Sequence, residues 1–136
     1  MRGFVFLALC WNCLTVMSGQ DAPIANDSVR VVYFEPLSYP IRARWKHEQG
    51  TVVLRLRLDA AGRVTSSTLI SGFESAIPDC LANSKKWHFE PNDEKAVIVV
   101  YRFSMEGLCH APCTSQFLFH PPNLSTITAG NMVIEP

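Results

Sequence analysis

The sequence predicts an α+β fold in two layers, with a small antiparallel sheet of about three to four strands packed against one main helix and one short helix. Three observations support this prediction. Residues 51–59 alternate apolar and polar side chains, residues 73–87 repeat apolar side chains at spacings of three and four, and residues 96–103 form a nearly continuous apolar run. A period of two is typical of a strand and a period of 3.6 of a helix. Strands and helices mixed in this order favour a sheet covered by helices.

The first elements are expected to be a strand and the short helix. Residues 29–34 are rich in β-branched and aromatic side chains and predict a strand. Pro40 suits the first turn of a helix over residues 41–47. Ile41 and Trp45, four positions apart, are expected to share the buried face of that helix.

A β-hairpin is expected next. Residues 51–59 direct the side chains at even positions to one face, and Gly62 supplies the left-handed residue of a short hairpin turn. Residues 63–71 form the returning strand, with a weaker alternation. The side chains expected on the buried face of the first strand are those of Val52, Leu54, Leu56 and Leu58.

The second half of the domain begins with the main helix. It is expected over residues 77–86, because Pro78 is tolerated only in a first turn. The chain then becomes extended and enters the apolar strand at residues 96–103. Beyond it, residues 115–119 are expected to form a short strand, and the tail after them shows weak strand character at best.

Composition and motifs exclude several classes of protein. The chain has 12 Lys+Arg and 12 Asp+Glu, and no basic run is longer than Lys85-Lys86. With this balance the sequence shows no basic patch of the kind that binds nucleic acid or a charged membrane surface. No P-loop, G-x-S-x-G or HExxH motif is present. We therefore expect a non-enzymatic protein with no cofactor and no small-molecule substrate.

The N-terminus predicts export. Arg2 precedes an apolar stretch at residues 3–16, and small residues precede a cleavage site after Ser18, with a site nearer Gln20 as the second choice. Residues 1–18 are therefore expected to be a signal peptide that directs the chain to the periplasm. The stretch is shorter than the ~20 residues of a membrane span, but an uncleaved inner-membrane anchor stays open as the alternative.

Three cysteines follow the leader. In an oxidising compartment we expect a disulfide between Cys109 and Cys113, which leaves Cys80 as a buried thiol. Another pairing stays open because the number is odd. The alternative is a zinc site that adds His110 and His120, but this spacing fits no standard zinc pattern. Counting free thiols in the mature protein decides between the bridge and two thiols.

An ordered series of short motifs resembles the TonB C-terminal family. The resemblance covers roughly residues 29–104, and each motif alone is weak. The positions that carry it are Tyr39, Pro40, Gly50, Gly62, Val64, Gly72, Trp87, Phe89 and Pro91.

The resemblance implies a domain that binds an extended peptide of an outer-membrane receptor, or another periplasmic protein, as an added strand beside its last strand. Such β-augmentation uses the free backbone groups of a sheet edge. The alternative is a structural or assembly protein that forms a homodimer through sheet edges without a transport role. A continuous apolar run also suits an interior strand. The candidate peptide-binding edge consists of Val97, Ile98, Val99, Val100, Tyr101, Arg102 and Phe103.

Two departures from the family limit what the resemblance implies. Residues 19–28 are expected to be a flexible lead-in that joins the leader to a domain at residues 29–106. It spans only ~35 Å when extended, too short for the usual periplasmic spacer, so energy transduction is not carried over to this chain. Residues 107–136 form a C-terminal extension, in which residues 117–119 are expected to lie on the free edge and to block or gate an outside peptide. Deleting residues 107–136 is expected to raise the affinity for an extended peptide.

Overall fold

The chain forms seven strands and two helices over the residues that the computed structural model describes, 29–110 and 112–133. The predicted leader and lead-in therefore lie outside the described residues. In chain order the elements are β1 (Val31–Tyr33), α1 (Ile41–Trp45), β2 (Gly50–Leu58), β3 (Val64–Ser71), α2 (Ile77–Ser84), β4 (His88–Phe89), β5 (Ala96–Cys109), β6 (Ser115–His120) and β7 (Leu124–Met132).

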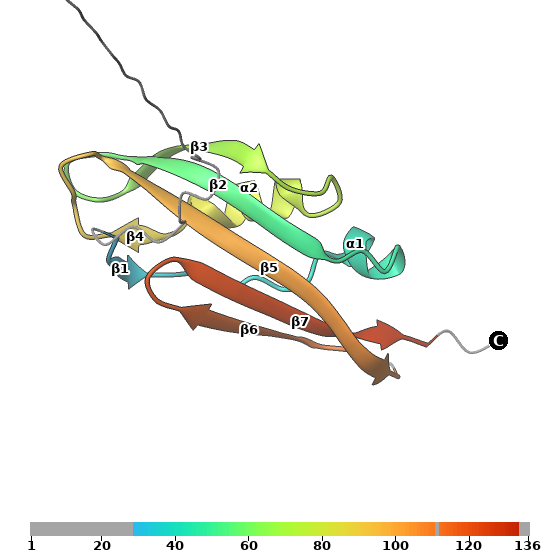
Figure 1. Ribbon diagram of the computed structural model, residues 1–136. Helices are drawn as coiled ribbons and strands as arrows, with labels where there is room; N and C mark the ends of the chain where they lie inside the picture. Colours follow the sequence, from blue (N-terminus) through green and yellow to red (C-terminus); the bar gives the residue numbers. More distant parts are fainter. Residues whose placement is uncertain (1–28, 111, 134–136) are drawn as a thin grey trace, which may run out of the picture.

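Five of the strands form one mixed sheet in the order β3-β2-β5-β7-β6 (Figure 1). Neighbours in this sheet are antiparallel except β5 and β7, which run parallel. β1 and β4 form a separate two-stranded ribbon. The predicted α+β fold is confirmed, but the predicted antiparallel sheet of three to four strands is wrong. The difference arises because the C-terminal extension adds two strands, and the last one enters the sheet beside β5.

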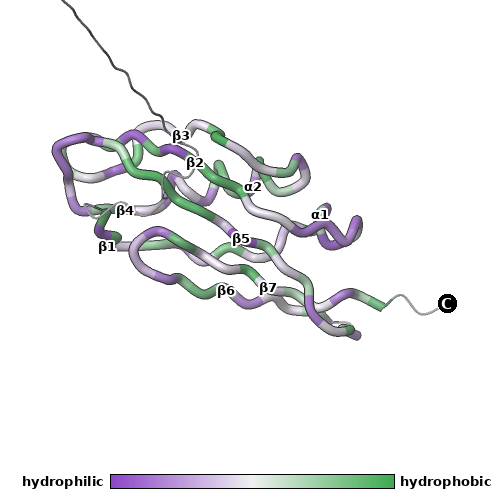
Figure 2. Tube along the Cα trace, in the orientation of Figure 1, coloured by the Kyte–Doolittle hydropathy of each residue, from purple (hydrophilic) through white to green (hydrophobic). Residues whose placement is uncertain are grey.

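The alternation of β2 places its side chains as predicted. Even positions are buried under the helices, whereas Arg55 and Arg57 lie on the opposite, open face of the sheet. Figure 2 shows the apolar stretches of β2 and β5 in the middle of the sheet, while the β2–β3 turn and α1 are mainly hydrophilic. Burial of these apolar side chains is the main term that stabilises the two layers. The buried β2 residues are Val52, Leu54, Leu56 and Leu58.

The two helices compare differently with their predictions. α2 has Pro78 in its first turn and buries Cys80 completely, as expected. In α1, the prediction that Ile41 and Trp45 share a buried face is wrong, since their side chains are 58% and 56% exposed. α1 has five residues, little more than one turn, and the residues that it buries are Ala43 and Arg44. A helix this short is oriented by its neighbours, because it has too few residues to form an apolar stripe of its own.

A buried asparagine joins α2 to the core aromatic side chains. The Trp87 indole nitrogen and the Tyr101 hydroxyl both donate to Asn83 Oδ1, at 2.9 and 2.8 Å. Asn83 Nδ2 in turn donates to the carbonyl of Glu35 at 2.9 Å. Trp87 and Phe89 are buried, which confirms their expected role in the core. This polar group is satisfied on all sides, as a buried amide requires.

Candidate peptide-binding site

The strand that was expected to offer a free edge, β5, lies inside the sheet. β2 pairs with it along residues 96–103, and β7 pairs with its other side from Val100, opposite Leu124, to Cys109, opposite Met132. The prediction that residues 97–103 form an open receiving edge is therefore contradicted for Val100 onward. The strand that covers this edge is β7, whereas residues 117–119 belong to β6 and pair with the far side of β7.

Side-chain amides close the part of the β5 edge that β7 does not reach. Asn92 bonds both backbone groups of Ala96, accepting from its N–H at 3.3 Å and donating to its carbonyl at 3.0 Å. Asn123 donates to the carbonyl of Ile98 at 2.9 Å, and its own carbonyl accepts from the N–H of Val100 at 3.0 Å. Capping an edge in this way prevents a foreign strand from pairing there.

We predict that Asn92→Ala opens this end of the strand. The N–H of Ala96 loses its side-chain acceptor, so its hydrogen exchange is expected to rise by about tenfold. The amide of Val97 is the internal control, because alternate residues direct their backbone groups to opposite sides and Val97 faces β2. Equal acceleration at both amides would show general loosening of the strand and contradict the prediction.

The alternation of backbone groups can be followed across the outer half of the sheet. The bond from the N–H of Val100 to Asn123 shows that even residues of β5, from Val100 to the register shift after Met105, face β7 and that odd residues of β7 face β5. Even residues of β7 therefore bond to β6, through partners such as Leu118. Phe117 and Phe119 of β6 then direct their backbone groups outward, where no described strand pairs with them.

The side chains that β7 directs into the core are smaller than those on either side. Each buried residue of β7 lies between one residue of β5 and one of β6. Aromatic rings lie on both sides of Ser125 and Ile127, so the space available to these two residues of the middle strand is narrow. The rows are Tyr101–Ser125–Phe119, Phe103–Ile127–Phe117 and Met105–Ala129–Ser115.

Ser125 is an unusual occupant of its row. Its side chain is completely buried, and its hydroxyl oxygen has no hydrogen-bond partner in the structure. The ring of Trp87 contacts the rings of both Tyr101 and Phe119, at centroid distances of 6.1 and 5.7 Å. A hydroxyl that loses water without gaining a partner is destabilising.

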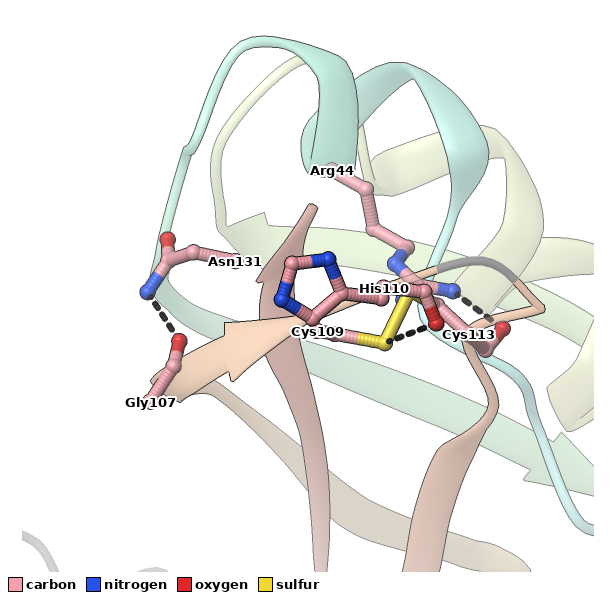
Figure 3. Close-up of a disulfide and its surroundings, with 6 residues drawn as sticks. All are labelled: Arg44, Gly107, Cys109, His110, Cys113 and Asn131. Atoms are coloured by element: carbon pink, nitrogen blue, oxygen red, sulfur yellow. Dashed lines mark hydrogen bonds between the residues drawn. A yellow bond between two sulfur atoms is a disulfide. The ribbon is translucent and has the colours of Figure 1, made fainter. Parts of the chain in front are cut away.

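The start of β6 is held to the rest of the domain by polar contacts at the disulfide loop. The predicted disulfide between Cys109 and Cys113 is present and ties the end of β5 to the residues before β6. Figure 3 shows the Arg44 side chain extending from α1 toward this loop, where its Nη1 donates to the Cys113 carbonyl at 3.2 Å. The Tyr39 N–H donates to Ser115 Oγ at 3.0 Å.

Aromatic contacts hold the body of β6. The ring of Phe34 lies 5.6 Å from that of Phe117 and 5.0 Å from that of Phe119. Tyr39 is buried nearby, and this burial raises the pKa of its phenol to about 12. Its hydroxyl therefore stays protonated and donates to the carbonyl of Glu48.

The remaining chemically capable side chains have structural surroundings. Cys109 and Cys113 are bonded to each other, so neither offers the thiolate that binds zinc. His120 lies at the far end of β6 and contacts Thr126 Oγ1 at 3.0 Å. Cys80 is a free, buried thiol, and burial raises its pKa, which disfavours the reactive thiolate.

These features define a class of small α+β domain in which the β2–β3 hairpin forms one side of the sheet and further strands are added beside β2. The family model of the Gram-negative bacterial TonB protein C-terminal matches residues 35–105. The match covers more than half of the chain, so the protein belongs to the TonB C-terminal family and carries a TonB-like, transport-related module. No curated protein and no solved structure matches the chain.

The family match also locates what is specific to this chain. It spans α1 through most of β5, whereas β6 and β7 lie beyond it. TonB-like domains in general are periplasmic or anchored in a membrane. Within the described part of the chain, neither helix is long and apolar enough to cross a bilayer.

Proposed function

We propose that this protein is an exported, non-enzymatic binding module of a TonB-type transport system, and that it binds an extended peptide of an outer-membrane receptor by β-augmentation at β5. The observation that carries the proposal is the pairing of β5 with a parallel strand from Val100 to Cys109. This strand comes from beyond the family domain and pairs with the same edge that an added strand would use.

The chemistry of β5 supports such pairing. Its even residues from Val100 to Ser104 direct N–H and carbonyl groups to one side, where any extended backbone satisfies them. The side chains at odd positions, such as Tyr101 and Phe103, are buried in the core and form the inner wall. Backbone pairing supplies affinity for extended chains in general, and the inner wall supplies selectivity.

A second function, assembly through sheet edges, has one observation in its favour. The outer edge of β6 pairs with no strand among the described residues, and Leu118 beside it is 54% exposed. Two copies can pair such edges and form a symmetric dimer without any transport role.

The experiment that separates the two functions maps backbone amides by NMR while peptides are added. Peptides from the N-terminal plug segments of outer-membrane receptors are titrated into the full chain and into Ile127→Ala, which weakens the packing of β7. If β7 competes with the peptide, a loss of about 2–4 kcal/mol in β7 packing raises the apparent affinity by tenfold or more. The amides of Arg102 and Ser104, which face β7, are expected to shift.

Leu118→Ala is the matched control, because it removes the same kind of side chain from the exposed face of β6. It is expected to leave peptide affinity unchanged. Shifts confined to Phe117 and Phe119 that grow with protein concentration, together with a dimer in analytical ultracentrifugation, would favour assembly. Absence of any peptide-dependent shift at β5, in both the native chain and Ile127→Ala, would exclude the proposed function.

A further inference from the structure

We infer that the strand slot, defined as the space between β5 and β6 that β7 fills, exchanges its own strand for an extended segment of a partner protein with the pattern small–x–aliphatic–x–Ala–Gly. This inference deepens the proposed function, on which it rests for the source of the segment. The bound segment would pair with two strands, β5 and β6, instead of one. β7 would compete with that segment for the slot.

The walls of the slot are attached to the domain independently of β7. β2 pairs with β5 along residues 96–103 on the side away from the slot. β6 is held by the disulfide loop, by the Tyr39 bond to Ser115, and by the contacts of Phe34 with the two phenylalanines of β6. Removing β7 therefore leaves both walls with contacts of their own, which is the condition for strand exchange.

The slot offers hydrogen bonds on both sides. Odd residues of β7 bond to β5, and even residues bond to β6. Nearly all backbone N–H and carbonyl groups of a segment in the slot thus form hydrogen bonds with β5 or β6. In a strand added to a single edge, only half of these groups form such bonds. Partners that only lie along an outer edge are expected to bind much more weakly.

Side-chain size in the slot sets the sequence pattern. Ile127 is completely buried in the middle row, between Phe103 and Phe117. Ala129 is 3% exposed in the next row, between Met105 and Ser115, so we expect a long side chain there to displace its neighbours. At Gly130 an added Cβ would lie 2.7 Å from the Cβ of Cys109, closer than such atoms approach. The pattern therefore ends in Ala–Gly.

Ser125 makes β7 a weaker occupant than the slot allows. Its hydroxyl is buried beside Tyr101 and Phe119 without a partner, so an alanine in the same place keeps the fit and removes the unsatisfied group. The gain from such a change corresponds to about tenfold in affinity. An intramolecular strand competes at an effective concentration of about millimolar. A weakened β7 is what allows an outside segment to compete against that advantage.

The test uses the full chain with a protease site inserted between Pro121 and Pro122, so that cleavage leaves β7 bound without a covalent link. The probe is a fluorescein-labelled peptide of residues 122–133, and its entry is followed by anisotropy. We expect one peptide to enter per chain after cleavage. Before cleavage, entry is expected only at much higher peptide concentration, because the linked strand competes at about millimolar effective concentration. Unlabelled peptide with Ser125→Ala is expected to displace the probe at about tenfold lower concentration than the native peptide.

Peptides that violate the pattern are the specificity arm. Ala129→Leu and Gly130→Ala are each expected to bind at least tenfold more weakly, because overpacking disturbs the walls. Thr128→Ser is the control, since its side chain faces the open side of the sheet and keeps its hydroxyl. It is expected to change affinity by less than about threefold. No exchange after cleavage, or equal affinity of all five peptides, would overturn the inference.

A second variant has no protease site, so it controls for any effect of the inserted site on the turn between β6 and β7. In full-length Ile127→Ala, the native peptide is expected to shift the amides of Arg102 and Ser104, and a peptide with the same Ile127→Ala change is not. Receptor plug peptides are tested in the same assays. Entry of the β7 peptide without entry of any plug peptide supports the slot and overturns the transport role. Plug peptides that bind only at the outer edge of β6 overturn the slot and leave receptor binding in place.

Discussion

Asn83→Ala is expected to lower the free energy of unfolding by about 3–5 kcal/mol, because it leaves two buried donors without an acceptor. The Trp87 indole N–H and the Tyr101 hydroxyl both end on Asn83 Oδ1. Neither donor has another partner in the core, and both side chains are at most 2% exposed. Urea denaturation of the purified chain measures the change directly.

A double-mutant cycle isolates the hydroxyl. Tyr101→Phe removes one of the two orphaned donors, so it is expected to be destabilising in the native chain and nearly neutral when Asn83→Ala is already present. Strictly additive effects would mean that the two groups do not interact and would contradict the role given to Asn83. Asn131→Ala is the control, because Asn131 Nδ2 bonds the Gly107 carbonyl at the exposed end of the sheet. It is expected to cost less than about 1 kcal/mol.

Gly62→Ala is expected to destabilise the domain by about 3 kcal/mol or more. Gly62 has a φ of +87°, and an added Cβ would lie 1.8 Å from the carbonyl oxygen of Phe89. The β2–β3 turn would have to separate from β4, breaking the bond from the N–H of Phe89 to the Gly62 carbonyl at 2.9 Å. Thermal unfolding followed by circular dichroism measures the loss.

Gly107→Ala is the control that separates the two causes of instability in Gly62→Ala, the positive φ and the close contact with Phe89. Gly107 also has a positive φ, of +70°, but an added Cβ meets nothing within 4 Å. It therefore reports backbone strain alone, about 1–2 kcal/mol. If both variants lose the same stability, the contact between Gly62 and Phe89 has no energetic role, and the prediction fails.

The sequence predicts elements well where a single strand or helix has a strong pattern of its own. The alternation of β2, the turn at Gly62 and the bridge between Cys109 and Cys113 are all confirmed. Pro78 correctly places the first turn of α2. In each case, the deciding signal lies within a few residues along the chain, so it does not depend on distant contacts.

The covering strand is the element that the sequence does not reveal. β7 faces the core with Ser125, Ile127 and Ala129, and two of these three side chains are small. The sequence of β7 therefore shows almost no alternation of large apolar and polar side chains. Thr126 and Thr128 favour strands, but the side chains that select this strand belong to β5 and β6. Tertiary context decides here, as it does for the exposed face of α1.

The bond between Cys109 and Cys113 also makes the outer half of the sheet depend on where the chain is. Thiols of this kind remain reduced in a cytosol and pair in an oxidising compartment. With both thiols reduced, β6 would be held only by non-covalent contacts such as those of Arg44 and Phe34. The disulfide closes the loop between β5 and β6 covalently. Under the proposed export, translocation would therefore complete this wall, and a chain kept in the cytosol would have a looser outer sheet than an exported copy.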